Sequence, residues 1–105
     1  RDVEIYNYGL VSIRRMSVVS QYTYLCTGTH DHTHPHMPLT WAPITIGSEC
    51  WIAAQSFVGP GVSIGDRSLV GACSVVTKSL PEGGIYGGNP ARYIKPRVIN
   101  AAAAG

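Results

Sequence analysis

The chain has 105 residues, the length of one small domain, and combines 45% hydrophobic with only 13% charged residues. Its net charge of +2 is too small to favour a nucleic-acid-binding protein, and it shows neither an apolar run of membrane-spanning length nor a secretory leader, so we expect a soluble, cytoplasmic protein. An average soluble domain has roughly 25% charged residues, and the lower content here favours a surface that contacts another subunit.

A six-residue repeat begins near the N-terminus. Aliphatic residues recur at every sixth place, and each is followed four places later by a small polar residue. The aliphatic members are Ile13, Val19 and Leu25, and the small members are Ser17, Thr23 and Thr29. A short fixed period indicates the architecture more strongly than local propensity does. We predict one complete coil over 13–30, preceded by a partial coil over 1–12.

The repeat is interrupted by residues 31–43, which contain three prolines and no period and are therefore predicted to form a loop. Four histidines alternate into this segment, namely His30, His32, His34 and His36. In an extended strand their imidazoles would share one face and could bind zinc or nickel. Because Pro35 opposes a regular strand, we expect no metal and keep the metal site as the minor alternative.

The repeat resumes at Ile46 and continues without a break to Leu80. Its first position holds Ile46, Ile52, Val58, Ile64, Val70 and Val76, its second Gly47, Ala53, Gly59, Gly65, Gly71 and Thr77, and its fifth Cys50, Ser56, Val62, Ser68, Ser74 and Leu80. The fifth-position side chains are mostly small and would fit a tight inner corner. We predict two further complete coils, over 46–63 and 64–81.

Hexapeptides of this pattern are typical of a parallel β-helix, in which three repeats form one triangular coil. A β-sandwich would need alternation of period two and a turn roughly every 8 to 12 residues, and the sequence has neither. An open β-helix exposes unpaired strand edges, so we expect the glycine-rich segment 82–97 to form a cap. The prediction is one all-β domain over 1–97, followed by a tail over 98–105.

The three cysteines are Cys26, Cys50 and Cys73, an odd number without close spacing. This pattern opposes a disulfide framework and a paired-cysteine zinc site. We interpret all three as small, buried or half-buried hydrophobic side chains.

Basic residues gather in the last third of the chain. They are Lys78, Arg92, Lys95 and Arg97, and Glu82 is the one acidic residue after Arg67. Such a set is either a solvated basic face or a binding site for a phosphorylated ligand. The sequence alone leaves both interpretations open.

Five stretches carry a resemblance to a known family: CTGTHD (26–31), APITIG with WIAA (42–54), VGPGVSIGD (58–66), VGACSVVTK (70–78) and GGNPARYIKPR (87–97). In their order and spacing they resemble the hexapeptide transferases, and within them the sugar and polysaccharide O-acetyltransferases of the colanic-acid type. This resemblance implies a left-handed parallel β-helix, a homotrimer with active sites between subunits, and acetyl-CoA as the acetyl donor. It implies no metal.

The resemblance also implies roles for single residues. His30, in the GTHD segment, matches the general base that takes a proton from the acceptor hydroxyl, and imidazole suits this role because it titrates near neutral pH. Trp51 matches a residue near the acetyl and acceptor groups. The residues matched to the CoA arm are Ala54, Ala72, Thr77 and Lys78, and those matched to the nucleotide phosphates are Arg92 and Lys95.

Two other functions remain open. A carbonic-anhydrase-like zinc enzyme on the same β-helix needs histidines from widely separated repeats, and no histidine follows His36, which opposes it. A non-catalytic structural or binding module is the stronger alternative, and it would not bind CoA. The acceptor also stays open among a sugar, a polysaccharide precursor and another small hydroxyl compound.

Overall fold

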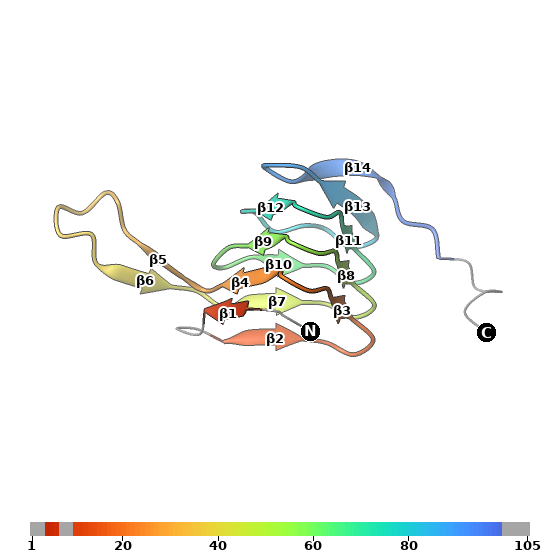
Figure 1. Cartoon of the computed structure of the whole chain (residues 1–105), viewed down its shortest axis with the longest axis horizontal. Coiled ribbons are helices and arrows are strands. Elements are labelled where there is room, and N and C mark those ends of the chain that lie inside the picture. The colour runs from red at the N-terminus through yellow and green to blue at the C-terminus, as the bar shows by residue number, and fades with distance from the viewer. Residues whose placement is uncertain (1–3, 7–9, 100–105) are drawn as a thin grey trace.

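The computed structural model describes residues 4–6 and 10–99, and every regular element within these ranges is a β-strand (Figure 1). The strands are β1 (Glu4–Tyr6), β2 (Val11–Ile13), β3 (Val18–Val19), β4 (Tyr24–Cys26), β5 (Gly28–His30), β6 (Leu39–Trp41), β7 (Ile44–Ile46), β8 (Trp51–Ile52), β9 (Phe57–Val58), β10 (Ser63–Ile64), β11 (Leu69–Val70), β12 (Val75–Val76), β13 (Gly84–Gly87) and β14 (Arg92–Pro96). The predicted all-β class is therefore confirmed for the described part of the chain.

Three parallel sheets form the faces of a triangular coil. Sheet A contains β1, β4, β9 and β12, and sheet B contains β2, β7 and β10. Sheet C contains β3, β8, β11 and β13, with β14 added antiparallel at its edge. From β2 onward the chain passes through sheets B, C and A and then returns to B one level further along (Figure 1). This path is a parallel β-helix, as the six-residue period predicts.

Each sheet contributes one column of side chains to the interior. The columns are Ile13, Ile46, Ile64 and Leu80 in sheet B, Val19, Ile52, Val70 and Tyr86 in sheet C, and Leu25, Val58 and Val76 in sheet A. Every member from Leu25 onward is buried, whereas Ile13 in the first coil is 43% exposed. The aliphatic first positions of the repeat are therefore the hydrophobic core, and their burial drives coil stacking.

The last level is shorter than the period predicts. Ile46 pairs with Ile64, eighteen residues later, but Val70 pairs with Tyr86, only sixteen residues later. Leu80, which the period assigns to a corner, instead bridges to Ile64 and completes the sheet B column. The assignment of Leu80 to a corner was wrong because the last level has two residues fewer than the eighteen that the period predicts.

Small polar side chains at the fifth position connect neighbouring coils. The Ser56 hydroxyl donates to the Gly71 carbonyl at 3.1 Å, and the Ser68 hydroxyl donates to the Pro81 carbonyl at 2.9 Å. Both serines are buried, and no buried side-chain nitrogen or oxygen among the described residues lacks a partner. Since an unpaired buried hydroxyl would cost about 1–3 kcal/mol, these bonds make the tight polar corners compatible with the core.

The turns between strands adopt a left-handed backbone at six-residue spacings. The φ angles lie between 58° and 63° at Met16, Tyr22, Glu49, Gln55, Arg67 and Cys73, and φ is 75° at Gly61. Residues with a Cβ adopt this region at a cost of about 1–2 kcal/mol each, so closure of the coil must impose it. The same turns direct side chains outward, and Cys73 is exposed. The expectation that all three cysteines are buried or half-buried was wrong for Cys73.

Residues 31–43 are not a plain loop. Strands β5 and β6 pair antiparallel, with Thr29 opposite Thr40, and form an arm that projects from the coil between β4 and β7 (Figure 1). Thr29, which the repeat assigns to a buried corner, is exposed on this arm, and the coil predicted over 13–30 leaves the β-helix after β4. Trp41, at the end of β6 on the same arm, is 58% exposed. The predicted break in the repeat is confirmed, but the extent of the loop and the coil predicted to reach residue 30 were wrong, because pairing between the two sides of an insertion leaves no mark in a six-residue period.

An antiparallel hairpin of β13 and β14 lies on the last level of sheet C. The Tyr86 hydroxyl donates to the Pro81 carbonyl at 2.9 Å, and the Tyr86 ring meets the Tyr93 ring edge-on with centroids 5.8 Å apart. Burial, and secondarily the neighbouring Tyr93, raises the pKa of Tyr86 above its usual value, so this hydroxyl stays a donor at neutral pH. Of the predicted partial coil at 1–12 and tail at 98–105, residues 1–3, 7–9 and 100–105 lie outside the described residues.

Two glycines at the corner between sheets B and C, Gly47 and Gly65, lie close against the coil above. A methyl group at Gly65 would lie 2.5 Å from the Glu82 backbone nitrogen, and one at Gly47 would overlap Asp66. At Gly71, on the corner between sheets C and A, the nearest atom would be 3.5 Å away, an ordinary contact. The second position of the repeat therefore tolerates Ala53 at the C–A corner, whereas at Gly47 and Gly65 of the B–C corner the coil above leaves no room for a Cβ.

We predict that Gly65→Ala lowers the free energy of unfolding by roughly 1–3 kcal/mol, because the added methyl meets backbone that cannot move independently. The matched control Gly71→Ala should change it by less than about 1 kcal/mol. Urea unfolding at one fixed protein concentration measures both. Equal stability of the two variants would contradict the assignment of this corner.

Candidate functional site

The arm holds His30 at the end of β5, exposed to solvent. Its Nδ1 lies 2.8 Å from the Met37 carbonyl oxygen. A carbonyl only accepts hydrogen bonds, so Nδ1 carries the proton in this contact and the neutral ring has its lone pair on Nε2. The arm thus presents an imidazole with one nitrogen fixed by backbone and the other available as a base.

The tip of the arm, residues 31–38, is held by hydrogen bonds rather than by packing. The Asp31 carboxylate accepts from the Thr33 backbone nitrogen at 3.0 Å and from the Thr33 hydroxyl at 2.5 Å. These two bonds lower the pKa of Asp31 below its usual value, so the carboxylate is ionised at neutral pH. The Asp31 backbone nitrogen also donates to the Pro38 carbonyl at 2.9 Å, which closes the tip.

The alternating histidines do not lie along one extended strand. The tip folds back through turns, and the His36 backbone nitrogen donates to the His34 Nδ1 at 3.1 Å. Within residues 4–6 and 10–99, no group of three or more His, Cys, Asp or Glu side chains could hold a metal ion. The alternative of a histidine metal site fails because the segment is not the extended strand on which it depended.

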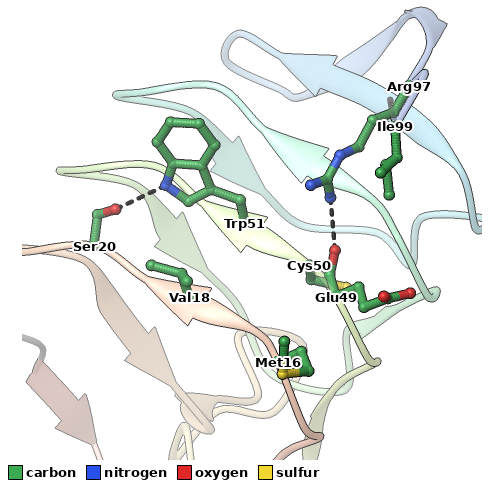
Figure 2. A pocket seen from close by; sticks show the side chains of 8 residues that line it. All are labelled: Met16, Val18, Ser20, Glu49, Cys50, Trp51, Arg97 and Ile99. Atoms are coloured by element: carbon green, nitrogen blue, oxygen red, sulfur yellow. Dashed lines mark hydrogen bonds between the residues drawn. The ribbon is translucent and has the colours of Figure 1, made fainter. Parts of the chain in front are cut away.

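Trp51 lies in β8 on the outer face of sheet C, 45% exposed, beside a pocket of about 480 Å³ (Figure 2). Its Nε1 donates to the Ser20 hydroxyl at 2.9 Å, which fixes the indole against the coil below. On another side of the pocket, Arg97 Nη1 donates to the Glu49 carbonyl at 2.6 Å. The lining residues are Met16, Val18, Ser20, Glu49, Cys50, Trp51, Arg97 and Ile99. An indole and aliphatic walls make this an amphipathic surface open to solvent.

His30 and Trp51 do not meet within one chain. The arm of His30 leaves the corner where the chain passes from sheet A to sheet B, whereas Trp51 lies on sheet C, the face opposite that corner. Figure 1 shows β5 and β8 on opposite sides of the coil. A site that uses both residues therefore needs more than one chain.

The residues matched to CoA lie at different corners. Ala54 and Ala72 stand one level apart at the C–A corner, where the Cys73 nitrogen donates to the Ala54 carbonyl at 3.0 Å. Arg92 pairs with Gly87 at the end of β14 that is nearest this corner. Thr77 and Lys78 are exposed at the A–B corner, across the width of sheet A.

Arg92 and Lys95, both matched to phosphates, lie at different places on β14. Arg92 is opposite Gly87, and Lys95 is opposite Ile85 beyond a bulge. Lys95 also lines a small pocket with Ile85, Pro96 and Val98. The structure therefore associates Arg92 with the C–A corner and places Lys95 further along the strand.

Sequence reasoning missed the groups that hold the candidate residues. The Met37 carbonyl beside His30 has no sequence signal, because backbone position depends on the fold of the arm. The Asp31-x-Thr33 spacing is a recognisable turn signal, in which an aspartate accepts from backbone two residues later. The sequence only weakly indicated that Ser20 and Arg97 would line the pocket beside Trp51.

Comparison with known proteins identifies similar chains. Residues 43–78 match the family model described as bacterial transferase hexapeptide (six repeats). The chain is 50% identical over 97 residues to a protein of Escherichia coli (strain K12) named as the colanic acid biosynthesis acetyltransferase WcaF, covering 92% of this chain and 53% of that protein. It is 47% identical over 53 residues to the galactoside O-acetyltransferase of the same organism, covering 50% of this chain and 26% of the relative.

Solved structures show the same similarity. A galactoside acetyltransferase in complex with coenzyme A superposes with a TM-score of 0.85 and 32% identity, over 90% of this chain and 48% of the other. An acetyltransferase with hexapeptide repeats from Vibrio cholerae O1 biovar eltor, complexed with acetyl coenzyme A, gives a TM-score of 0.84 and 26% identity, over 90% and 54%. The chain thus spans about half the length of the WcaF protein and of these two solved structures. Its described part has no helix that could cross a membrane.

Proposed function

We propose that the chain is a bacterial hexapeptide-repeat transferase, an O-acetyltransferase that moves the acetyl group of acetyl-CoA to a hydroxyl of a sugar or polysaccharide precursor. Similarity to acetyltransferases of colanic acid and galactosides supports the acceptor class. Similarity to structures that hold coenzyme A or acetyl coenzyme A supports the donor.

The observation that carries the proposal is the fixed orientation of His30. Because Nδ1 donates to the Met37 carbonyl, Nε2 is the nitrogen that can accept the proton of an acceptor hydroxyl. As that proton moves to Nε2, the hydroxyl oxygen attacks the thioester carbonyl and forms a tetrahedral oxyanion. A backbone N–H would stabilise this charge. Collapse breaks the carbon–sulfur bond, and the CoA thiolate takes the proton back from the imidazolium.

We further propose a homotrimer whose active sites lie between subunits. His30 projects from the A–B corner and Trp51 lies on the opposite face, so two neighbouring chains are needed to supply both. A contact between two different surfaces closes into a ring when the rotation permits, and a triangular coil suits three copies. The exposed Trp41 and Met37 on the arm, at 58% and 57%, would be covered by a neighbour.

For the cofactor, we propose that the pantetheine arm lies along the C–A corner, where Ala54 and Ala72 offer little side-chain bulk. CoA has two separate phosphate groups, and cations at two places suit them. Arg92 would meet one phosphate group and Lys78 the other, with Thr77 beside it and Lys95 further along β14.

Left-handed coiling completes the proposal. The hexapeptide-repeat acetyltransferases with which the chain superposes support this hand.

We predict that His30→Ala lowers kcat by roughly 10²- to 10⁴-fold, the usual contribution of a positioned acid–base group. Affinity for acetyl-CoA should be unchanged, because His30 lies on the arm and not at the C–A corner. The control His32→Ala, an exposed histidine two residues away, should keep wild-type turnover. These rates are measured as the CoA released in the presence of a galactoside, which is quantified by chromatography. Turnover by His30→Ala near the wild-type rate would reject the mechanism.

The double variant Lys78→Ala/Arg92→Ala should bind CoA roughly 10-fold more weakly, because two charge-assisted contacts to phosphate are lost. Its affinity should also fall less steeply with added salt, since fewer charge pairs remain to be screened. The control Arg15→Ala removes a cation from the first coil and should bind as the wild type does. Calorimetric titration at low and high salt separates these outcomes, and an unchanged salt dependence in the double variant would contradict the assigned phosphate contacts.

A further inference from the structure

We propose that Asp31 is a positioning residue for the base: through Thr33 it holds the tip of the arm in the shape that presents the Met37 carbonyl to His30 Nδ1. This inference rests on the proposed role of His30 as the base. It adds a residue and a set of contacts that determine which imidazole nitrogen can act.

The first step is the dependence of the base on Met37. If the Met37 carbonyl moved away, either ring nitrogen of His30 could carry the proton, and the ring could rotate. Only the 2.8 Å contact between Nδ1 and the Met37 oxygen selects the tautomer with a free Nε2. A misplaced or wrongly protonated base transfers a proton poorly even when it is close to the acceptor.

The second step connects Met37 to Asp31 through the tip. The Met37 backbone nitrogen donates to the His34 carbonyl at 3.0 Å, and the His34 nitrogen donates to the Asp31 carbonyl at 3.3 Å. The Asp31 nitrogen in turn donates to the Pro38 carbonyl at 2.9 Å. Met37 therefore sits in a closed ring of backbone bonds that begins and ends at Asp31.

The third step is the absence of packing that could replace these bonds. Residues 32–38 are all exposed, and Asp31 is the one half-buried residue of the tip. Of the side chains in the tip, the Asp31 carboxylate makes the shortest contacts, both to Thr33 across a single intervening residue. Such an aspartate turn restricts the backbone where the chain reverses, so its loss should loosen the ring that carries Met37. The lowered pKa of Asp31 agrees with a carboxylate engaged by these donors.

Asp31→Ala and Asp31→Asn form the matched pair that tests this inference. Asparagine keeps an oxygen that accepts from the Thr33 nitrogen and hydroxyl, whereas alanine removes it. In the free protein, ¹⁵N chemical shifts of the His30 ring report which nitrogen carries the proton, without any acceptor or CoA. We expect Nδ1–H to predominate in the wild type and in Asp31→Asn, and the two tautomers to mix in Asp31→Ala. His32→Ala is the control for an unrelated change in the tip.

Kinetics supply the second measurement. Asp31→Ala should lower kcat by between roughly 10- and 100-fold with KM for acetyl-CoA unchanged, and Asp31→Asn should restore most of the rate. An unchanged His30 tautomer in Asp31→Ala would overturn the inference, as would a changed tautomer with full turnover. If Asp31→Asn is as impaired as Asp31→Ala, the carboxylate acts by charge and not through Thr33, which also overturns it. Failure of the proposed function is a separate result, because it would appear as full turnover in His30→Ala.

Discussion

Hydrogen bonds from each coil to the next keep the aliphatic columns in register. The positions of the turns, the arm and the candidate site depend on this pairing. The Gly47 nitrogen donates to the Ile64 carbonyl at 2.8 Å, and the Phe57 nitrogen donates to the Ser74 carbonyl at 2.8 Å. Because strands at successive levels pair in this way, residues eighteen apart stack above one another between residues 45 and 76. Short strands of two or three residues suffice, since a buried column and a corner hydrogen bond support each of them.

This constraint explains how much of the fold could be predicted from the sequence. The columns through Ile46 and Ile64 were predicted, because burial repeats at the same period as the backbone. The shortened last level and the left-handed turns at Gln55 and Cys73 could not be predicted, since coil closure overrides the preference of these residues for other backbone conformations. The β5–β6 arm was missed for another reason: its strands pair across an insertion that has no period.

The candidate site is harder to predict because its parts come from different levels and corners. His30 was proposed from a short motif, but its ring orientation depends on a contact with the Met37 carbonyl, a backbone group in the tip of the arm. Trp51 was also proposed from the sequence, but no pattern in the sequence predicts that sheet C faces away from the arm. The coil thus separates the two residues within a chain, and the proposed trimer would bring them together. A projecting arm is a simple way for one subunit to complete the site of another.

The most direct test of this shared site is complementation between two inactive variants. The His30→Ala and Trp51→Ala variants are co-expressed, and the acetyl-transfer rate of the mixed assembly is measured. If His30 and Trp51 act from neighbouring subunits, random mixing leaves both residues intact in about a quarter of the sites, and activity returns to roughly that share of the wild-type rate. If both residues act from the same chain, every site in the mixture carries one defect, and the mixture stays as inactive as the separate variants, which would contradict the account.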